Sequence, residues 1–356
     1  MSDSFPPRAD DDGLQPPAVD LFDDAGRPEE ALHPGFRQLR DSPLLAPARD
    51  LLRALQGDFP DREFAERFQT GSFEAALLEI YLFEMFRSGG HQVDRSHRDP
   101  AFLLARGGIR AAVDALTVGI QFGDGSGPAS GSPRDEQPRA GAGGSLIRKL
   151  QQRQWALPHT DGLPFVIAVQ DFEHMELPHG APPSAVLHFL FGAPPSQEIG
   201  AVLPEGFFGL GGAEHISGIL FCCDATVSKF NRLAQEGHGS RAVHLLRHGS
   251  CLGAQGDLDA PAGFVYEVGQ RGTQREAWNE GTVLVHNPHA RHPLPREWLG
   301  AATEVAFEDG HVATRFERGF HPFTCTTETL AGDTPAWWLE TRTRLLEKDM
   351  AAHPPA

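Results

Sequence analysis

The sequence predicts an α/β fold in which helices flank a mixed central sheet and an antiparallel extension follows towards the C-terminal end. Three observations lead to this prediction. Strand-like and helix-like stretches alternate from about residue 101 onward. The segment 73–87 (FEAALLEIYLFEMFR) is apolar nearly all round, as expected of a buried helix. Closely spaced strand candidates follow residue 260, which favours antiparallel pairing there.

The first 41 residues predict an acidic segment without fixed structure. Residues 1–35 are rich in Pro, Asp and Glu and carry few large apolar groups, so they bury too little surface to offset their ordering entropy. Residues 42–349 then predict a single α/β domain. Within it, the Gly-, Ser- and Pro-rich stretch 123–144 predicts a mobile loop, and residues 350–356 predict a disordered tail.

The elements of this domain follow from apolar periodicity and from Gly and Pro stop signals. Helices are expected at 44–55, 61–68, 73–87, 145–156, 184–192, 224–237 and 335–349. Strands are expected at 101–105, 109–122, 164–172, 214–223, 242–247, 263–268, 282–286, 303–308 and 311–317. The Gly107-Gly108 pair predicts the turn of a hairpin between the first two strands.

Composition narrows the classes of function. The formal net charge is −17, and residues 1–66 carry 15 acidic and 7 basic side chains. This acidity disfavours charge-driven binding of nucleic acid, which needs cations to displace counterions, although a local basic groove is compatible with it. The apolar runs are too short to span a bilayer, no signal peptide is evident, and four cysteines without a CxxC pair favour reduced thiols in the cytoplasm.

Three charged residues lie on successive elements of the predicted domain. A helix carries Glu79, a hairpin carries Asp114, a basic helix (SLIRKLQQRQWA) carries Lys149, and a buried strand (PFVIAVQDF) follows. This order resembles the core of the PD-(D/E)XK, or restriction-endonuclease-like, nuclease superfamily. The resemblance covers a quarter to a third of the chain. It implies that Glu79, Asp114 and Asp99 bind Mg²⁺ or Mn²⁺ and that Lys149 orients the attacking water or stabilises charge.

The sequence departs from that family pattern at two positions. The aspartate of the family's "PDF" pattern aligns with Ala101 in Pro100-Ala101-Phe102, and a shift of one residue to Asp99 would reverse the face of a strand. Leu116 stands where the motif's lysine belongs, so Lys149 would have to supply it from the neighbouring helix. The chain as a whole also resembles a group of uncharacterised bacterial proteins, through stretches such as GAEHISGILF, SKFNR and HNPHARHPLP.

Each candidate residue also has a structural interpretation. Glu79 either belongs to a site or pairs with an arginine or a hydroxyl in the core. Asp114 needs a partner, because an unpartnered acid in the middle of a strand costs stability. Lys149 either serves the site or forms part of a solvated basic helix face.

A histidine-rich stretch, HNPHARH, offers a second candidate site. His286, His289 and His292 could hold Zn²⁺ or Fe²⁺, but Pro288 and Pro293 prevent a continuous helix and do not fix the three side chains on one face. The alternatives are a structured loop with partly exposed histidines, or a contact with nucleic acid or a partner protein.

Two further patterns have weaker functional meaning. The glycine-rich segment 205–215 lacks the spacing of a phosphate loop and favours a turn that displays Phe207 and Phe208. Lys229 and Arg232 lie one helical turn apart, so they either bind phosphate or belong to a solvated helix face.

Two functions therefore remain open. One is a divergent or degenerate metal-dependent nuclease that cleaves phosphodiester bonds. The other is a non-catalytic binding or regulatory protein on a nuclease-like fold, in which the His286–His292 loop or the acidic N-terminus contacts a protein partner.

Overall fold

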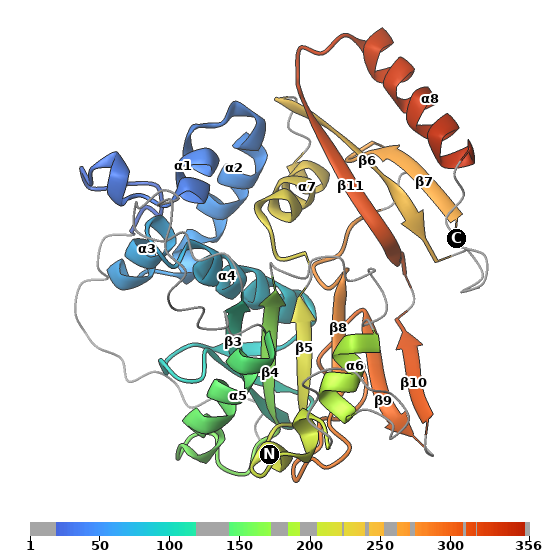
Figure 1. Ribbon diagram of the computed structural model, residues 1–356. Coiled ribbons are helices and arrows are strands. Elements are labelled where there is room, and N and C mark those ends of the chain that lie inside the picture. Colours follow the sequence, from blue (N-terminus) through green and yellow to red (C-terminus); the bar gives the residue numbers. More distant parts are fainter. Residues whose placement is uncertain are drawn as a thin grey trace, which may run out of the picture.

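The fold was analysed in a computed structural model, shown in Figure 1. It describes residues 19–118, 142–171, 184–192, 205–222, 224–238, 242–252, 262–270, 275–308, 311–317 and 319–352. The α-helices are α1 (Pro34–Asp41), α2 (Ala46–Leu55), α3 (Arg62–Gln69), α4 (Phe73–Ser88), α5 (Ala142–Gln152), α6 (Ser184–Phe191), α7 (Val227–His238) and α8 (Ala336–Ala352). The strands are β1 (Gln92–Asp94), β2 (Phe102–Arg106), β3 (Ile109–Val118), β4 (Phe165–Asp171), β5 (Gly218–Cys222), β6 (Val243–Cys251), β7 (Ala262–Glu267), β8 (Thr282–His286), β9 (Thr303–Glu308), β10 (His311–Phe316) and β11 (Pro322–Ala331).

The main sheet has eight strands in the order β1-β2-β3-β4-β5-β8-β9-β10. The pairs β3–β4, β4–β5 and β8–β9 are parallel, and the other pairs in this sheet are antiparallel. The sheet is therefore mixed, and the predicted fold class is confirmed. The Gly107-Gly108 hairpin joins β2 and β3 as predicted, and both glycines have positive φ (58° and 76°), which glycine adopts without the steric cost of a Cβ.

Two hydrophobic clusters cover the two faces of this sheet, because successive side chains of a strand point to opposite sides. One cluster joins alternate residues of β2–β5 and β8, such as Phe102, Leu104 and Val113, to helices α1–α4 and to Phe230 of α7. The other joins the intervening residues, such as Leu103 and Ala112, to α5, α6 and the 3₁₀ segments around Trp155 and Phe207. Helix α4 is buried along most of its length, which its apolar sequence predicts.

A second, smaller sheet has the strand order β11-β6-β7 and is antiparallel throughout. Helix α8 packs on it, with Met350 against Gly263, and Figure 1 shows both lying apart from the main sheet beyond α7. A separate antiparallel sheet is therefore present, as predicted, but of the strands predicted after residue 260 only β7 belongs to it, because β8, β9 and β10 lie in the main sheet.

Several boundaries predicted from composition are wrong. Residues 19–41 are ordered: α1 lies within them, and Leu21, Phe22, Leu32, Phe36 and Leu39 are buried in the core. These side chains pack against α2–α4, and this tertiary contact outweighs the acidic, proline-rich composition. Residues 142–144 begin α5, and residues 350–352 continue α8 instead of a disordered tail. The remainder of the predicted loop and tail, and residues 1–18, lie outside the described residues.

Within the described ranges, no helix has the length and apolarity required to cross a membrane. Cys222, Cys251 and Cys325 are free thiols, and the first two are buried.

Candidate functional site

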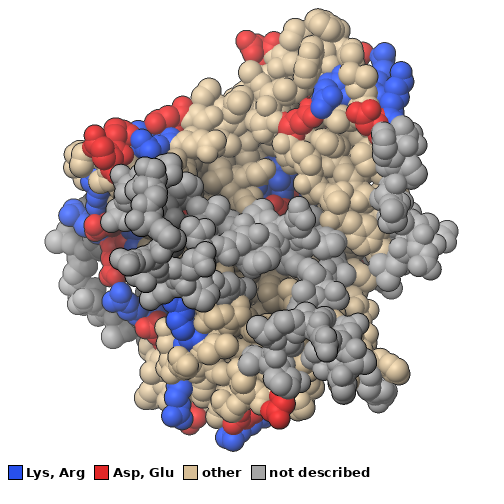
Figure 2. Space-filling model, viewed as in Figure 1, with Lys and Arg blue, Asp and Glu red and all other residues tan. Residues whose placement is uncertain are grey.

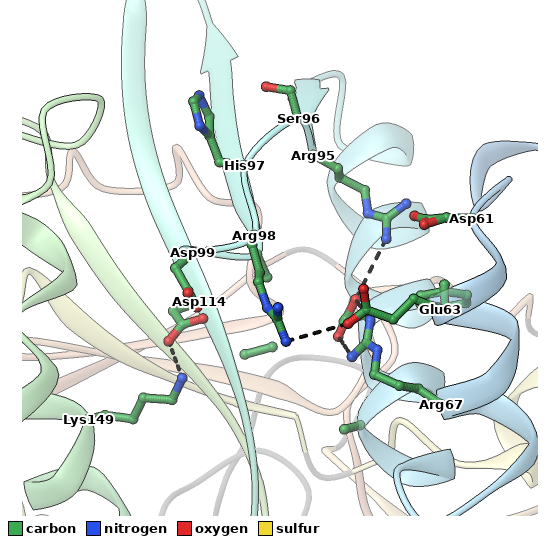
Figure 3. A pocket seen from close by; sticks show the side chains of 15 residues that line it. Asp61, Glu63, Arg67, Arg95, Ser96, His97, Arg98, Asp99, Asp114 and Lys149 are labelled. Carbon is green, nitrogen blue, oxygen red and sulfur yellow. Dashed lines mark hydrogen bonds and ion pairs between the residues drawn. The ribbon is translucent and has the colours of Figure 1, made fainter.

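A cavity of about 460 Å³ opens where α3, α4, the segment between β1 and β2, β3 and α5 meet. All four residues that the sequence nominates for a nuclease-like site line it, namely Glu79, Asp99, Asp114 and Lys149. The other polar side chains in its wall are Asp61, Glu63, Arg67, Arg95, Ser96, His97 and Arg98. Figure 3 shows two groups within the cavity: Asp99, Asp114 and Lys149 gather on one side, whereas Arg67 and Arg95 lie on the other side.

Asp114 lies on β3, just beyond the point where the pairing of β3 with β2 ends. The last antiparallel pair between β2 and β3 is Phe102 with Val113, so Asp114 extends past the start of β2 and keeps only β4 as a neighbour. Strand alternation points its side chain to the α5 face, together with Ala112. This position explains how a mid-strand acid reaches the cavity.

Lys149 forms the ion pair that Asp114 needs. Its Nζ donates a hydrogen bond to Asp114 Oδ2, and Asp114 itself is only 4% exposed. Burial raises the pKa of the Asp114 carboxyl above its ordinary value, whereas Lys149 and the Ala101 backbone N–H act in the opposite direction. Leu116, at the position of the motif's lysine, is partly buried against the α5-side cluster, and the lysine reaches Asp114 from α5.

Asp99 stands beside this pair. Both aspartates line the cavity and lie on the same side of it (Figure 3), and the charge of Asp99 acts to raise the pKa of Asp114. Gln154 Nε2 donates to Asp99 Oδ1 at 3.0 Å, and His159 Nε2 lies 2.7 Å from the Asp99 carbonyl oxygen. The segment that follows α5 therefore fixes the orientation of Asp99, while α5 itself supplies Lys149.

Glu79 forms ion pairs with two arginines, Arg67 and Arg95. Arg67 binds it through two hydrogen bonds of 2.7 and 3.2 Å, and Arg95 lies 3.6 Å from its second oxygen. The predicted pairing of Glu79 with an arginine is therefore present, in the wall of the cavity and not in the core. Neither arginine was predicted from the sequence. The signal for Arg95 was the charged run Asp94-Arg-Ser-His-Arg-Asp99 before the hairpin.

A preformed metal centre is not present in the described part of the chain, where no three His, Cys, Asp or Glu side chains are grouped to hold an ion. The three histidines of the HNPHARH stretch do not form one group. His286 is buried at the end of β8, and its Nε2 lies 3.2 Å from Glu304 Oε2. His289 and His292 lie in the following turn, where the His292 carbonyl accepts a hydrogen bond from Ser217.

The glycine-rich segment and two cationic residues of α7 lie in surroundings other than those predicted. Phe207 and Phe208 are buried in the α5-side cluster instead of being displayed. Lys229 and Arg232 are also buried, at 0% and 3% exposure, so neither a phosphate site nor a solvated helix face describes them. Arg232 binds Glu276 with two hydrogen bonds of 2.7 and 2.8 Å, and Lys229 Nζ lies 3.2 Å from Glu276.

These residues belong to a buried ionic network that joins the two sheets. Arg247 of β6 pairs with Glu280, which together with Glu276 precedes β8 of the main sheet. Lys229 Nζ also donates to the Glu280 carbonyl at 2.7 Å. Buried charges of this kind are tolerated only when they are paired and hydrogen-bonded, so the network is a structural link between α7, the second sheet and the main sheet.

Glu236, at the edge of this network, makes stability depend on pH. Burial raises its pKa to about 7, while its carboxylate accepts two hydrogen bonds from the Glu276 N–H. Between the ordinary glutamate value of 4.5 and about 7, the folded protein holds a proton that the unfolded chain releases. This group therefore lowers the free energy of unfolding as pH rises through that window. We expect Glu236→Gln to flatten the fall in melting temperature between pH 5 and 8, measured by calorimetry against the wild type. Identical slopes in the two proteins would contradict this assignment.

In comparisons with known proteins, no family model, no curated protein and no solved structure matches the chain. The site is therefore identified by its geometry alone. An acid pair and a lysine lie on one side of a polar cavity, and an arginine-bound glutamate lies on the other.

Proposed function

We propose that the cavity binds a phosphodiester of nucleic acid together with Mg²⁺ or Mn²⁺ and hydrolyses it. In this proposal Asp99 and Asp114 hold the ion, and Lys149 stabilises the charge that develops on the phosphate. The observation that carries the proposal is the buried Asp114–Lys149 ion pair with Asp99 beside it, where β3 extends past β2. A carboxylate pair and a lysine at one point of a cavity are the groups that metal-assisted phosphoryl chemistry uses.

The donor set fits a hydrated ion better than a closed cage. Mg²⁺ is commonly bound by one or two carboxylates, with water and substrate phosphate completing its six ligands. Asp99 and Asp114 match this requirement, whereas Glu79 is bound to Arg67 and Arg95 and stays outside the proposed ion site. The missing third ligand is thus compatible with an ion that binds together with its substrate.

The charge of the cavity also favours an ion. Four cationic side chains and five carboxylates line it, a formal net charge of −1, so a bound cation would strengthen the attraction of a phosphate. On the face shown in Figure 2, basic and acidic side chains of the described residues are intermixed and form no large basic patch. A divalent ion at Asp99 and Asp114 would add positive charge on that side of the cavity and strengthen the binding of a phosphodiester.

The roles of the side chains follow from this arrangement. When bound, the ion would acidify a water molecule and neutralise charge on the phosphate oxygens. Gln154 orients Asp99, and the Ala101 N–H orients Asp114. Lys149, which forms an ion pair with Asp114, can donate a hydrogen bond to a phosphate oxygen in the transition state.

One observation favours a second candidate, a nucleic-acid-binding protein without catalysis. Ala101 and Leu116 replace two polar positions of the resembled motif, and the arginine pair removes Glu79 from the acid cluster. Such a protein would bind the same ligand through the cavity and leave it intact.

The test is cleavage of single- and double-stranded DNA and RNA with Mg²⁺ or Mn²⁺, beside an EDTA control and the Asp114→Asn variant. Asparagine keeps the volume of the side chain and removes its charge. We expect metal-dependent cleavage that the variant lacks. Binding without cleavage would support the second candidate, and neither binding nor cleavage by folded protein would refute both.

A further inference from the structure

The arginine-bound Glu79 has more cationic partners than it needs. Arg67 alone gives it a two-bond pairing, which is the optimal geometry between a guanidinium and a carboxylate. Arg95 adds a second guanidinium at 3.6 Å. One carboxylate is therefore shared by two arginines that come from different parts of the chain, α3 and the segment after β1.

Both guanidinium groups are held in place by aromatic rings. The Arg95 guanidinium carbon lies 4.0 Å from the ring centre of Phe59 and 5.4 Å from that of Phe64, and the Arg67 carbon lies 5.3 Å from the Phe64 ring centre. Arg95 also donates to the Asp58 carbonyl at 2.9 Å. Two arginines fixed in this way lose little conformational freedom when they bind an anion.

The Arg95 guanidinium is largely buried among charged neighbours of both signs. Burial lowers its pKa, and the nearby Arg67 acts in the same direction, opposed by Glu79 and neighbouring aspartates. A phosphate diester carries one negative charge, as the Glu79 carboxylate does, so it can take the place of that carboxylate on the pair. A phosphate diester also offers two equivalent oxygens to such a pair.

The pair is reachable from the cavity. The side chains of Arg67 and Arg95 are 37% and 16% exposed, and both line the cavity that holds Asp114 and Lys149. Arg98 of the same wall is 86% exposed and lies 3.4 Å from the exposed Glu63, a pairing that solvent weakens. Figure 3 shows Arg67 and Arg95 extending toward each other on the side opposite Lys149.

We propose that Arg67 and Arg95 form a phosphate subsite and that Glu79 occupies this subsite until a phosphate of the nucleic-acid strand displaces it. The inference rests on the proposed function for the identity of the ligand. It deepens that function by defining the substrate class: one phosphate binds at Asp99, Asp114 and Lys149, and a second phosphate of the same strand binds at the arginines. An oligonucleotide is thus the substrate, in preference to a mononucleotide.

The experiment measures binding of a fluorescein-labelled single-stranded oligonucleotide by anisotropy, in EDTA and at several salt concentrations. Glu79→Gln removes the competing carboxylate charge and frees both arginines, so we expect tighter binding, by roughly tenfold. We expect Arg67→Gln and Arg95→Gln to weaken binding and each to lower the slope of log affinity against log salt by about one. If Glu79 were only a metal ligand, its substitution would leave binding in EDTA unchanged.

Glu84→Gln is the matched control, because Glu84 is a second arginine-paired glutamate of α4 that does not line the cavity. It should leave affinity unchanged. Unchanged or weaker binding by folded Glu79→Gln protein would overturn the inference. If that variant does not fold, Arg67→Gln decides: weaker binding supports the subsite, and unchanged binding overturns it. Because no metal is present, a failure of the subsite is distinct from a failure of cleavage in the assay with Mg²⁺.

Discussion

Replacing Lys149 by Met should reduce metal-dependent cleavage by about 10²–10³-fold, because it removes a preorganised cation from the position where negative charge develops. The loss should appear in kcat more than in KM, since the proposed hydrogen bond strengthens in the transition state. The measurement is steady-state cleavage of a labelled oligonucleotide with Mn²⁺.

Arg148→Met provides the control for this prediction. Arg148 precedes Lys149 on α5, but it is exposed and its guanidinium binds Ser145, away from Asp114. It should retain nearly full activity. Equal losses in the two variants would indicate a general effect of α5 charge, and an active Lys149→Met protein would exclude the proposed role of the lysine.

The second large effect concerns the buried ionic network. We expect Glu276→Gln to lower the free energy of unfolding by roughly 3–5 kcal/mol, because it leaves buried cations without their counter-charge. Glu276 is fully enclosed and contacts Lys229 and Arg232, and Arg247 lies 3.7 Å away. Urea denaturation followed by circular dichroism measures the change, with the slope of the transition showing whether unfolding remains two-state.

An exposed ion pair gives the comparison. Glu340 and Arg344 of α8 are 67% and 70% exposed, so Glu340→Gln should change stability by less than about 0.5 kcal/mol. A loss below about 1 kcal/mol for Glu276→Gln would show that the network does not hold the second sheet to the main sheet.

The sequence predicted the fold best where burial alone decides the structure. Helix α4 and strand β4 are apolar enough to be buried wherever they pack, and both were located within a residue or two. Strand β11 was missed because its threonines alternate without a strong apolar face, and it is fixed by long-range pairing with β6. Residues 19–41 were misjudged for a related reason: their few apolar side chains are buried by partners elsewhere in the chain.

The candidate site was predicted in part. Asp114 stands out because it interrupts an apolar strand, and Lys149 because it follows on a basic helix. The arginines that bind Glu79 were missed, since their meeting depends on how α3 and the segment after β1 pack. Lys229 and Arg232 were misread because one helical turn of spacing is the same on a solvated face and on a buried one.

The most direct test of the proposed ion site is an electron paramagnetic resonance titration of Mn²⁺. It should be made with a non-cleavable phosphorothioate oligonucleotide present, on the wild type and on Asp114→Asn. We predict about one bound Mn²⁺ per chain, weakened when the oligonucleotide is omitted and lost in the variant. Equal binding by both proteins, or no binding by either, would contradict the assignment of Asp99 and Asp114 to the ion.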